Sequence, residues 1–294
     1  MIKITVPAST SNLGSGFDTL GLSLNLYQTI EANPSDRWNI SVSGRDAEEI
    51  PRDQTNLILE AYEANGGEKP FALHIQNDIP IGKGLGSSAV AIIAGIVLAH
   101  LQKKKTIDKE LIFEKALQIE NHPDNLAASI FGGLQVATTD SEGKVHHLSG
   151  PIPQGTNMSL IVPATKVNTK EARKILPHSY SLPILTQSLG RIALLLESFH
   201  RREYSLLKVA MADEIHQPYR AEMLDGLPEV LGMLQKDKSV YGATISGAGP
   251  SLFLLTKGAK IDSLGQITQF WILKGERITV IPVEVDMEGV QWSC

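Results

Sequence analysis

Apolar and polar residues alternate in short runs along much of the chain, starting directly after the N-terminal methionine. Alternation with a period of two is typical of β-strands that bury one face and leave the other in solvent. The pattern predicts eight strands, which cover residues 2–7, 38–43, 71–75, 133–138, 157–162, 243–245, 251–256 and 278–285.

Other segments repeat apolar residues every three or four positions, which is the period of an α-helix. One of them contains the almost purely apolar stretch 89–101 and predicts a buried helix. The pattern predicts helices at about 56–65, 87–104, 108–120, 184–200, 203–214 and 227–236. Strands and helices are mixed without a regular alternation, so we expect an α+β fold rather than a doubly wound sheet.

The stretch 140–157, DSEGKVHHLSGPIPQGTN, is rich in residues that favour turns. A chain of 294 residues has room for two domains of ordinary size. We therefore expect two domains, one formed by residues 1–155 and the other by residues 156–294. One long surface loop would show the same composition and is the alternative.

Composition and charge exclude some classes of function. The apolar fraction of 42% and the charged fraction of 20% are those of a globular protein. The net charge is −5 and the isoelectric point is about 5.9, so no basic surface argues for nucleic acid as a partner.

Three features predict a cytoplasmic protein without a membrane partner. The only cysteine, Cys294, can form no internal disulfide, which fits a reducing compartment. The N-terminus runs straight into a strand pattern and lacks the layout of a signal peptide. The longest apolar run has 13 residues, too few to span a bilayer. The oligomeric state stays open, with a homodimer as one alternative.

A glycine-rich loop, IPIGKGLGSSAV at 79–90, stands directly before the predicted buried helix. Its glycine spacing fits neither the Walker A motif nor the dinucleotide-binding fingerprint. It still suits an anion, because glycines let backbone N–H groups approach a phosphate and the helix dipole adds positive charge. Ser87 and Ser88 could cap the helix or offer hydroxyls to a phosphate or to Mg²⁺. A tight strand-to-helix turn is an equally good interpretation of this loop by itself.

Two further glycine-bearing segments change that balance. The first, VPASTSNLGSGFDTLGLSLNLY at 6–27, gathers asparagine, glycine and aspartate in one short loop. The second, YGATISGAGPSLFLL at 241–255, places glycines and a proline between two apolar strands. Each is weak evidence alone, but the three together, at these positions, are specific.

These three segments resemble, in order and spacing, the three motifs of the GHMP kinases, and the form of the first is similar to that of the homoserine kinases within the superfamily. HPDNLAASIFGGL (122–134), TKEARKILP (169–177) and PYRAEML (218–224) extend the resemblance over nearly the whole chain. It implies an N-terminal domain like ribosomal protein S5 domain 2 and a ferredoxin-like C-terminal domain. It also implies ATP and Mg²⁺, an active site between the domains, and transfer of the γ-phosphoryl group to the side-chain hydroxyl of L-homoserine in threonine biosynthesis.

The resemblance implies that the glycine-rich loop holds the phosphates of ATP. Lys83 precedes the second glycine of the loop, so we do not assign it the role of a Walker lysine. The nucleotide-binding residues expected on this basis are Pro80, Ile81, Gly82, Lys83, Gly84, Leu85, Gly86, Ser87, Ser88 and Ala89.

For the amino-acid substrate, the resemblance implies that Arg173 and Arg220 hold the carboxylate, a task suited to planar guanidinium groups. Thr169 adds a hydroxyl contact, and Asn12 and Asp18 lie near the substrate hydroxyl and ammonium. From the residues alone, both arginines could be ordinary surface groups. In the same way Asn12 could favour a turn, and Asp18 could cap a helix formed by TLGLSL.

The resemblance further implies a Mg²⁺ site made by Ser88 and Glu120, with Glu114 as the alternative carboxylate. His122 is expected to contact the substrate. Asp124 matches, within a residue, the aspartate that serves as base in mevalonate-type relatives, and direct transfer without a base is equally open. We expect Asp18, Asp124 and Arg220 to be required for turnover.

Two other functions remain to be separated from this one. Another GHMP kinase, acting on mevalonate or a sugar, would share the ATP loop but would have less need of paired arginines with an ammonium site. A GHMP-like binding protein without catalysis is the less favoured alternative, because the three motifs are intact.

Overall fold

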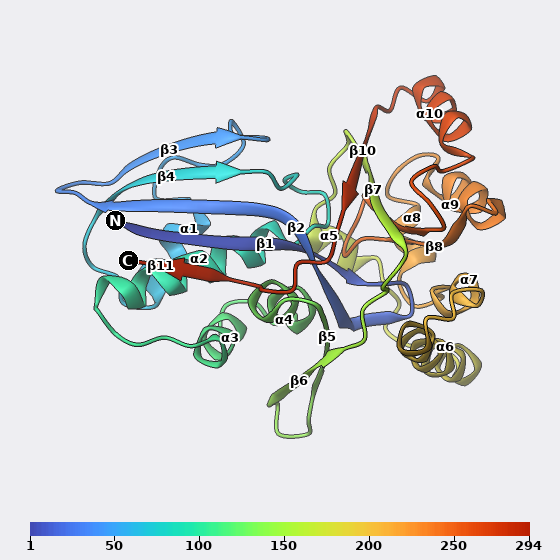
Figure 1. The fold of residues 1–294 in the computed structure, drawn as a ribbon, viewed down its shortest axis with the longest axis horizontal. Helices are drawn as coiled ribbons and strands as arrows, with labels where there is room; N and C mark the ends of the chain where they lie inside the picture. The colour runs from blue at the N-terminus through green and yellow to red at the C-terminus, as the bar shows by residue number, and fades with distance from the viewer.

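The computed structural model describes residues 1–294, which form two β-sheets with helices packed against them (Figure 1). The first sheet is built around two long antiparallel strands, β1 (Ile2–Asn12) and β2 (Gly16–Pro34). Its path runs β11-β1-β2-β4-β3, and β5 pairs with the early part of β2 and with β6. The other strands are β3 (Asn39–Gly44), β4 (Phe71–Asn77), β5 (Leu134–Thr139), β6 (Val145–Gly150) and β11 (Gln291–Ser293).

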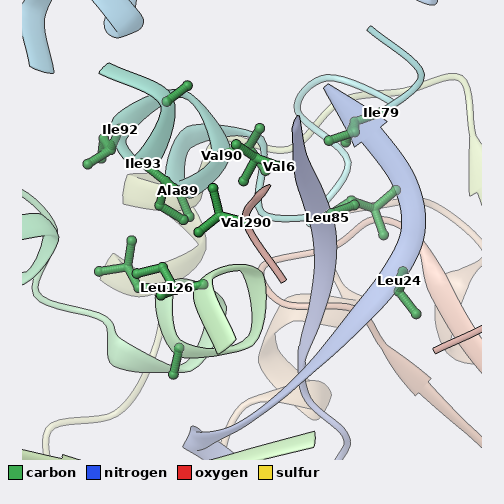
Figure 2. Close-up of a cluster of buried hydrophobic side chains, with 14 of the residues drawn as sticks. Val6, Leu24, Ile79, Leu85, Ala89, Val90, Ile92, Ile93, Leu126 and Val290 are labelled. Carbon is green, nitrogen blue, oxygen red and sulfur yellow. The ribbon is translucent and has the colours of Figure 1, made fainter. Parts of the chain in front are cut away.

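Four helices cover one face of this sheet (Figure 1). They are α1 (Leu57–Ala64), α2 (Ser87–Gln102), α3 (Lys109–Leu117) and α4 (Pro123–Phe131). The central helix, α2, is buried from Ala89 to Ala99 apart from Ala91, as its apolar sequence predicts. Figure 2 shows side chains of α2 beside Val6 of β1 and Leu126 of α4. Burial of this apolar surface is the main favourable contribution to folding of this half of the molecule.

The second sheet has four antiparallel strands in the order β10-β7-β9-β8. These strands are β7 (Asn157–Pro163), β8 (Val240–Ile245), β9 (Leu252–Thr256) and β10 (Ile278–Val283). Its own core includes Val230, Leu254 and Trp271. The helices of this half are α5 (Thr169–Lys174), α6 (Leu182–Arg201), α7 (Leu207–Ala210), α8 (Gln217–Ala221), α9 (Leu227–Lys236) and α10 (Leu264–Leu273).

The chain passes from the first sheet to the second between β6 and β7, close to residue 155, and its last strand returns. β11 pairs with β1, so the two termini lie side by side (Figure 1). A division into domains at residue 155 remains a prediction, and β11 lies with the first sheet under any division. No helix in the structure is both long enough and apolar enough to cross a membrane.

The predicted α+β class is confirmed, and each of the eight predicted strands has a counterpart within a few residues. Two expectations for single segments are wrong. The segment TLGLSL, considered as a helix, lies in β2, where it pairs with β1 on one side and with β5 on the other. Only residues 207–210 of the predicted helix 203–214 are helical. The turn-rich stretch 140–157, where we expect the domain boundary, contains β6, and the boundary itself stays a prediction. The pattern also missed the helices α4, α5, α8 and α10 and the strand β11.

Candidate active site

The three glycine-bearing segments meet at the end of β1, although they are far apart in sequence. A Cβ atom on Gly84 would lie 2.1 Å from the carbonyl oxygen of Ser246, and Gly84 has φ +75°, so only glycine fits there. The Ser246 hydroxyl donates to the Gly84 carbonyl at 2.7 Å and is hydrogen-bonded to Thr10 Oγ1 at 2.8 Å. The N–H of Gly247 donates to the carbonyl of Ser11 at 3.2 Å. The sequence motifs therefore form one contiguous structure.

Between β4 and α2, the backbone N–H groups of residues 82–88 donate to no acceptor in the protein. We call these groups the amide nest. Gly82, Gly84 and Gly86 all have positive φ, and alternation of such residues with ordinary ones turns successive N–H groups to one side. The nest continues into the N-terminus of α2, where the helix dipole is positive. Such an arrangement binds anions, phosphates above all.

The prediction that Ser87 or Ser88 caps α2 is wrong. The N-cap is Gly86 in the left-handed conformation, and no side chain accepts from the first turn. Both serines belong to the helix itself, and neither hydroxyl is used in a hydrogen bond within the protein. Ser88 is exposed, so its hydroxyl is free for a ligand.

Two buried side chains of residues within the nest, Lys83 and Leu85, anchor the glycine-rich loop. Leu85 belongs to the main apolar core, close to Ile79 (Figure 2). The ammonium of the buried Lys83 donates to the backbone carbonyls of Ala164 and Thr165, and burial lowers its pKa. Lys83 therefore fastens the loop to the segment after β7, in keeping with our not assigning it a Walker role.

Asp18 lies at the start of β2 with φ 52°, and its carboxylate faces Arg173 of α5. Arg173 Nη2 donates to the two Asp18 carboxylate oxygens at 2.7 and 2.9 Å. The side chain of Asn12 holds Asp18 in place. Its Oδ1 accepts from the Asp18 N–H at 3.1 Å, and its Nδ2 donates to the Gly247 carbonyl at 3.0 Å. Asn12 thus ties the first motif to the third.

Arg220, on α8, is 4% exposed and makes no direct ion pair. Its Nη1 donates to the Gly247 carbonyl at 2.7 Å and to His216 Nδ1 at 3.3 Å, and its Nε donates to the Ala172 carbonyl at 3.3 Å. Burial lowers the pKa of Arg220 to about 10, so the guanidinium stays charged at neutral pH. Its Nη2 has no hydrogen-bond partner in the protein and is left for a ligand.

The sequence analysis missed two residues of this cluster, Phe17 and His216. The guanidinium carbons of Arg173 and Arg220 lie over the Phe17 ring, 5.4 and 5.2 Å from its centroid, and the His216 ring stacks on it at 5.2 Å. Phe17 does precede Asp18 in the first motif. Nothing in the sequence spacing, however, indicates contact with residues about 200 positions away.

Asp124 lies in the first turn of α4 and is 2% exposed. Burial, followed by the nearby charge of Asp18, raises its pKa to about 6. The Asn125 N–H donates to Asp124 Oδ1 at 2.7 Å, and the Asn125 side chain is hydrogen-bonded to Ser9 and Ser11 of β1. A carboxylate with this pKa can accept a proton near neutral pH.

Glu120 and His122 lie in the loop between α3 and α4 and are hydrogen-bonded through Oε1 and Nδ1. This bond lowers the pKa of Glu120 and raises that of His122, and the charge of Arg173 acts on both. Glu114 lies on the exposed side of α3 without a partner. Thr169 is exposed at the start of α5, one turn before Arg173.

The donors present fit a Mg²⁺ ion that is held partly by phosphate. The structure contains no group of three or more histidine, cysteine, aspartate or glutamate residues able to hold a metal. Ser88 offers an unbonded hydroxyl, and Glu120 offers the oxygen that His122 does not use. Mg²⁺ is often bound by one or two protein groups together with substrate phosphates and water.

Comparison with known proteins identifies the same family that the three glycine-bearing segments resemble. The family model described as the GHMP kinases N terminal domain matches residues 55–133, and that of the GHMP kinases C terminal matches residues 195–266. A homoserine kinase of Desulfitobacterium hafniense is 35% identical over 271 residues, 90% of this chain and 91% of that protein. A homoserine kinase of Aquifex aeolicus is 34% identical over 298 residues, 99% of each chain. The crystal structure of homoserine kinase from Cytophaga hutchinsonii has a TM-score of 0.82 at 25% identity, covering 99% of this chain and 97% of that one.

The chain therefore belongs to the GHMP kinases, and within them to the group that contains these homoserine kinases. The family predicted from the three glycine-bearing segments is confirmed. So is the two-domain fold of that family, to which the two sheets and their helices correspond. Membership makes the chain a kinase, and kinases of this family use ATP.

The pKa of Asp124 leads to a prediction for stability. A raised pKa means that the folded state disfavours the ionised carboxylate, so stability falls as pH rises from the ordinary aspartate value of 3.8 through about 6. At pH 7.5 we expect Asp124→Asn to raise the free energy of unfolding by about 2–3 kcal/mol, from roughly two pKa units at 1.36 kcal/mol each. Urea unfolding measured between pH 4 and pH 8 checks this. A variant less stable than the wild type at pH 7.5 would contradict it.

Proposed function

We propose that this protein transfers the γ-phosphoryl group of ATP to the side-chain hydroxyl of L-homoserine, giving O-phospho-L-homoserine and ADP. The observation that carries the proposal is the amide nest together with a cluster of Arg173, Arg220 and Asp18. The cluster suits a small zwitterion, because paired guanidiniums recognise a carboxylate and Asp18 recognises an ammonium. The name of the relatives matched over 90% or more of this chain supports the same acceptor. Such a reaction would serve threonine biosynthesis.

In this proposal the amide nest binds the phosphates of ATP. Its N–H groups are held by buried anchors and need no rearrangement when the phosphates arrive, which is the preorganisation that electrostatic catalysis requires. Ser88 and Glu120 are the residues that would hold Mg²⁺ beside them. When bound, the ion neutralises charge on the phosphate oxygens.

The amino-acid acceptor is bound at the other end of the cluster. Its carboxylate lies against Arg173 and Arg220, whose Nη1 and Nη2, respectively, make no hydrogen bond in the protein. Its ammonium lies against Asp18, which has lone pairs left after accepting from Arg173. His122, whose pKa is affected by the charges of Arg173 and Asp18, and Thr169, one turn before Arg173 on α5, are proposed to make further contacts. Contacts with Arg173, Arg220 and Asp18 then orient the hydroxyl of the acceptor toward the γ-phosphate.

The chemical step forms a bond between the acceptor oxygen and the γ-phosphorus as the bond from that phosphorus to the ADP oxygen breaks. The hydroxyl proton passes to the Asp124 carboxylate, which is mostly ionised above pH 6. The Arg220 charge and the amide nest stabilise the charge on the transferring group. Direct transfer, in which the proton passes to phosphate or water, is the alternative route.

The direct test is ADP release by the purified protein with MgATP and L-homoserine, mevalonate, galactose or no acceptor. We expect release with L-homoserine alone. Arg220→Ala should lower kcat/KM for L-homoserine by about 100-fold, the usual effect of removing one partner from a buried charged contact. Arg201→Ala is the matched control, since Arg201 is exposed on α6 and bonds only Glu197. Release with mevalonate or galactose instead would reassign the acceptor, and no release with any acceptor would favour a binding protein.

The Mg²⁺ role is tested by the same substitution at two neighbouring carboxylates. We expect Glu120→Gln to raise the Mg²⁺ concentration that gives half-maximal activity by about tenfold, since loss of a charged ligand weakens binding of the ion. Glu114→Gln should leave it unchanged, because Glu114 points into solvent on α3. The titration is followed by ADP release at saturating ATP. The reverse pattern would assign the ligand to Glu114, and two unchanged variants would remove both from the metal site.

A further inference from the structure

The two guanidiniums of the candidate site share one aromatic ring. Arg173 comes from α5 and Arg220 from α8, yet their central carbons lie over the same Phe17 ring, at 5.4 and 5.2 Å from its centroid. Phe17 itself is half-buried next to Asp18 at the start of β2. Arg220 Nε also donates to the Ala172 carbonyl of α5 at 3.3 Å, which joins the two elements through the backbone, and the Phe17 ring is the side chain that both guanidiniums contact.

Two cations held close together in a partly buried site repel each other. The charge of Arg173 indeed contributes to the lowered pKa of Arg220, after burial. The electron-rich face of an aromatic ring attracts a guanidinium, and the attraction grows as water is excluded. A ring in contact with both groups therefore offsets part of their repulsion and fixes where each one lies. An aliphatic side chain of similar size would fill the space without this attraction.

His216 supports the ring and one of the arginines together. Its imidazole stacks on Phe17, its Nδ1 accepts from Arg220 Nη1, and its Nε2 donates to the Gly14 carbonyl at 3.1 Å. These bonds require the neutral imidazole. Asp213 holds the same turn, because its carboxylate accepts from the N–H groups of Ile215, His216 and Gln217. The imidazole on which the Phe17 ring stacks is therefore held in place by hydrogen bonds on both of its nitrogens.

We propose that Phe17 is a positioning residue that sets the separation and orientation of Arg173 and Arg220 for the carboxylate of the acceptor. Phe17 acts through the two arginines and takes no part in the phosphoryl transfer itself. The inference rests on the proposed function, because it assumes an acceptor with a carboxylate. On this proposal Phe17 helps the protein to discriminate between acceptors that have a carboxylate and acceptors that lack one.

The test compares Phe17→Leu and Phe17→Tyr with Phe131→Leu. Phe131 is a matched control because it also stacks on a histidine, His147, with the same interplanar angle of 24° as the pair of Phe17 and His216. Three quantities are measured: kcat and KM for L-homoserine, KM for ATP, and the inhibition constant of 3-aminopropan-1-ol, which lacks only the carboxylate of L-homoserine, as a competitor.

We expect Phe17→Leu to raise KM for L-homoserine about tenfold, the effect of losing two such contacts. The inhibition constant of 3-aminopropan-1-ol and KM for ATP should stay unchanged. Phe17→Tyr, which keeps the ring, should restore KM for L-homoserine, and Phe131→Leu should behave as the wild type.

The inference would be overturned if Phe17→Leu weakened L-homoserine and 3-aminopropan-1-ol equally, since that result describes a general loss of structure. It would also be overturned if Phe17→Leu behaved like Phe131→Leu while the wild type phosphorylated L-homoserine. If the wild type did not phosphorylate L-homoserine at all, the proposed function would fail first and the inference with it.

Discussion

The close approach of two backbone loops, one from each sheet, is the constraint on which the rest of the structure depends. Gly84 lies so near the Ser246 carbonyl that no side chain fits between them, and hydrogen bonds from Ser246 and Gly247 join the two loops to β1. This contact brings the glycine-rich loop beside the residues that hold Asn12 and Arg220, since both donate to the Gly247 carbonyl. The proposed nucleotide and acceptor sites are therefore neighbours because one tight contact makes them so.

The amide nest is costly in isolation, because its residues include three glycines in the left-handed conformation and its N–H groups have no partner. Neighbouring buried groups hold it in place. Leu85 is inserted in the main core, Lys83 is bonded to carbonyls of the second half, and α2 is buried along most of its length. The same reasoning applies to Asp124, whose burial is unfavourable for a carboxylate and whose position is fixed by the bonds of Asn125 to β1. Unfavourable local features of this kind persist only where the surrounding structure determines them.

The sequence predicted the α+β class, eight strands, the buried helix α2 and the family, because each depends on local periodicity or on a motif within one segment. It missed β2 around TLGLSL, whose leucines do alternate as in a strand, because the segment was considered only as a helix capped by Asp18; pairing with β1 and β5 makes it a strand. It missed α4, which begins at Pro123 and has only nine residues. The candidate site residues that belong to motifs, such as Asp18, Arg173 and Arg220, were predicted from the sequence, and the structure brings them together. Phe17 and His216 were not predicted, because their importance lies in contacts between distant segments that no single-sequence pattern records.

The central claim is that one contiguous site presents phosphate to the amide nest and an amino-acid carboxylate to the arginine pair. A crystal structure with a non-hydrolysable ATP analogue, Mg²⁺ and L-homoserine tests it most directly. The account predicts phosphate oxygens within hydrogen-bond distance of the N–H groups of residues 82–88. It also predicts the homoserine carboxylate on Arg173 and Arg220, and the hydroxyl between Asp124 and the γ-phosphate. Phosphates bound away from the nest, or a homoserine carboxylate bound away from both arginines, would contradict it.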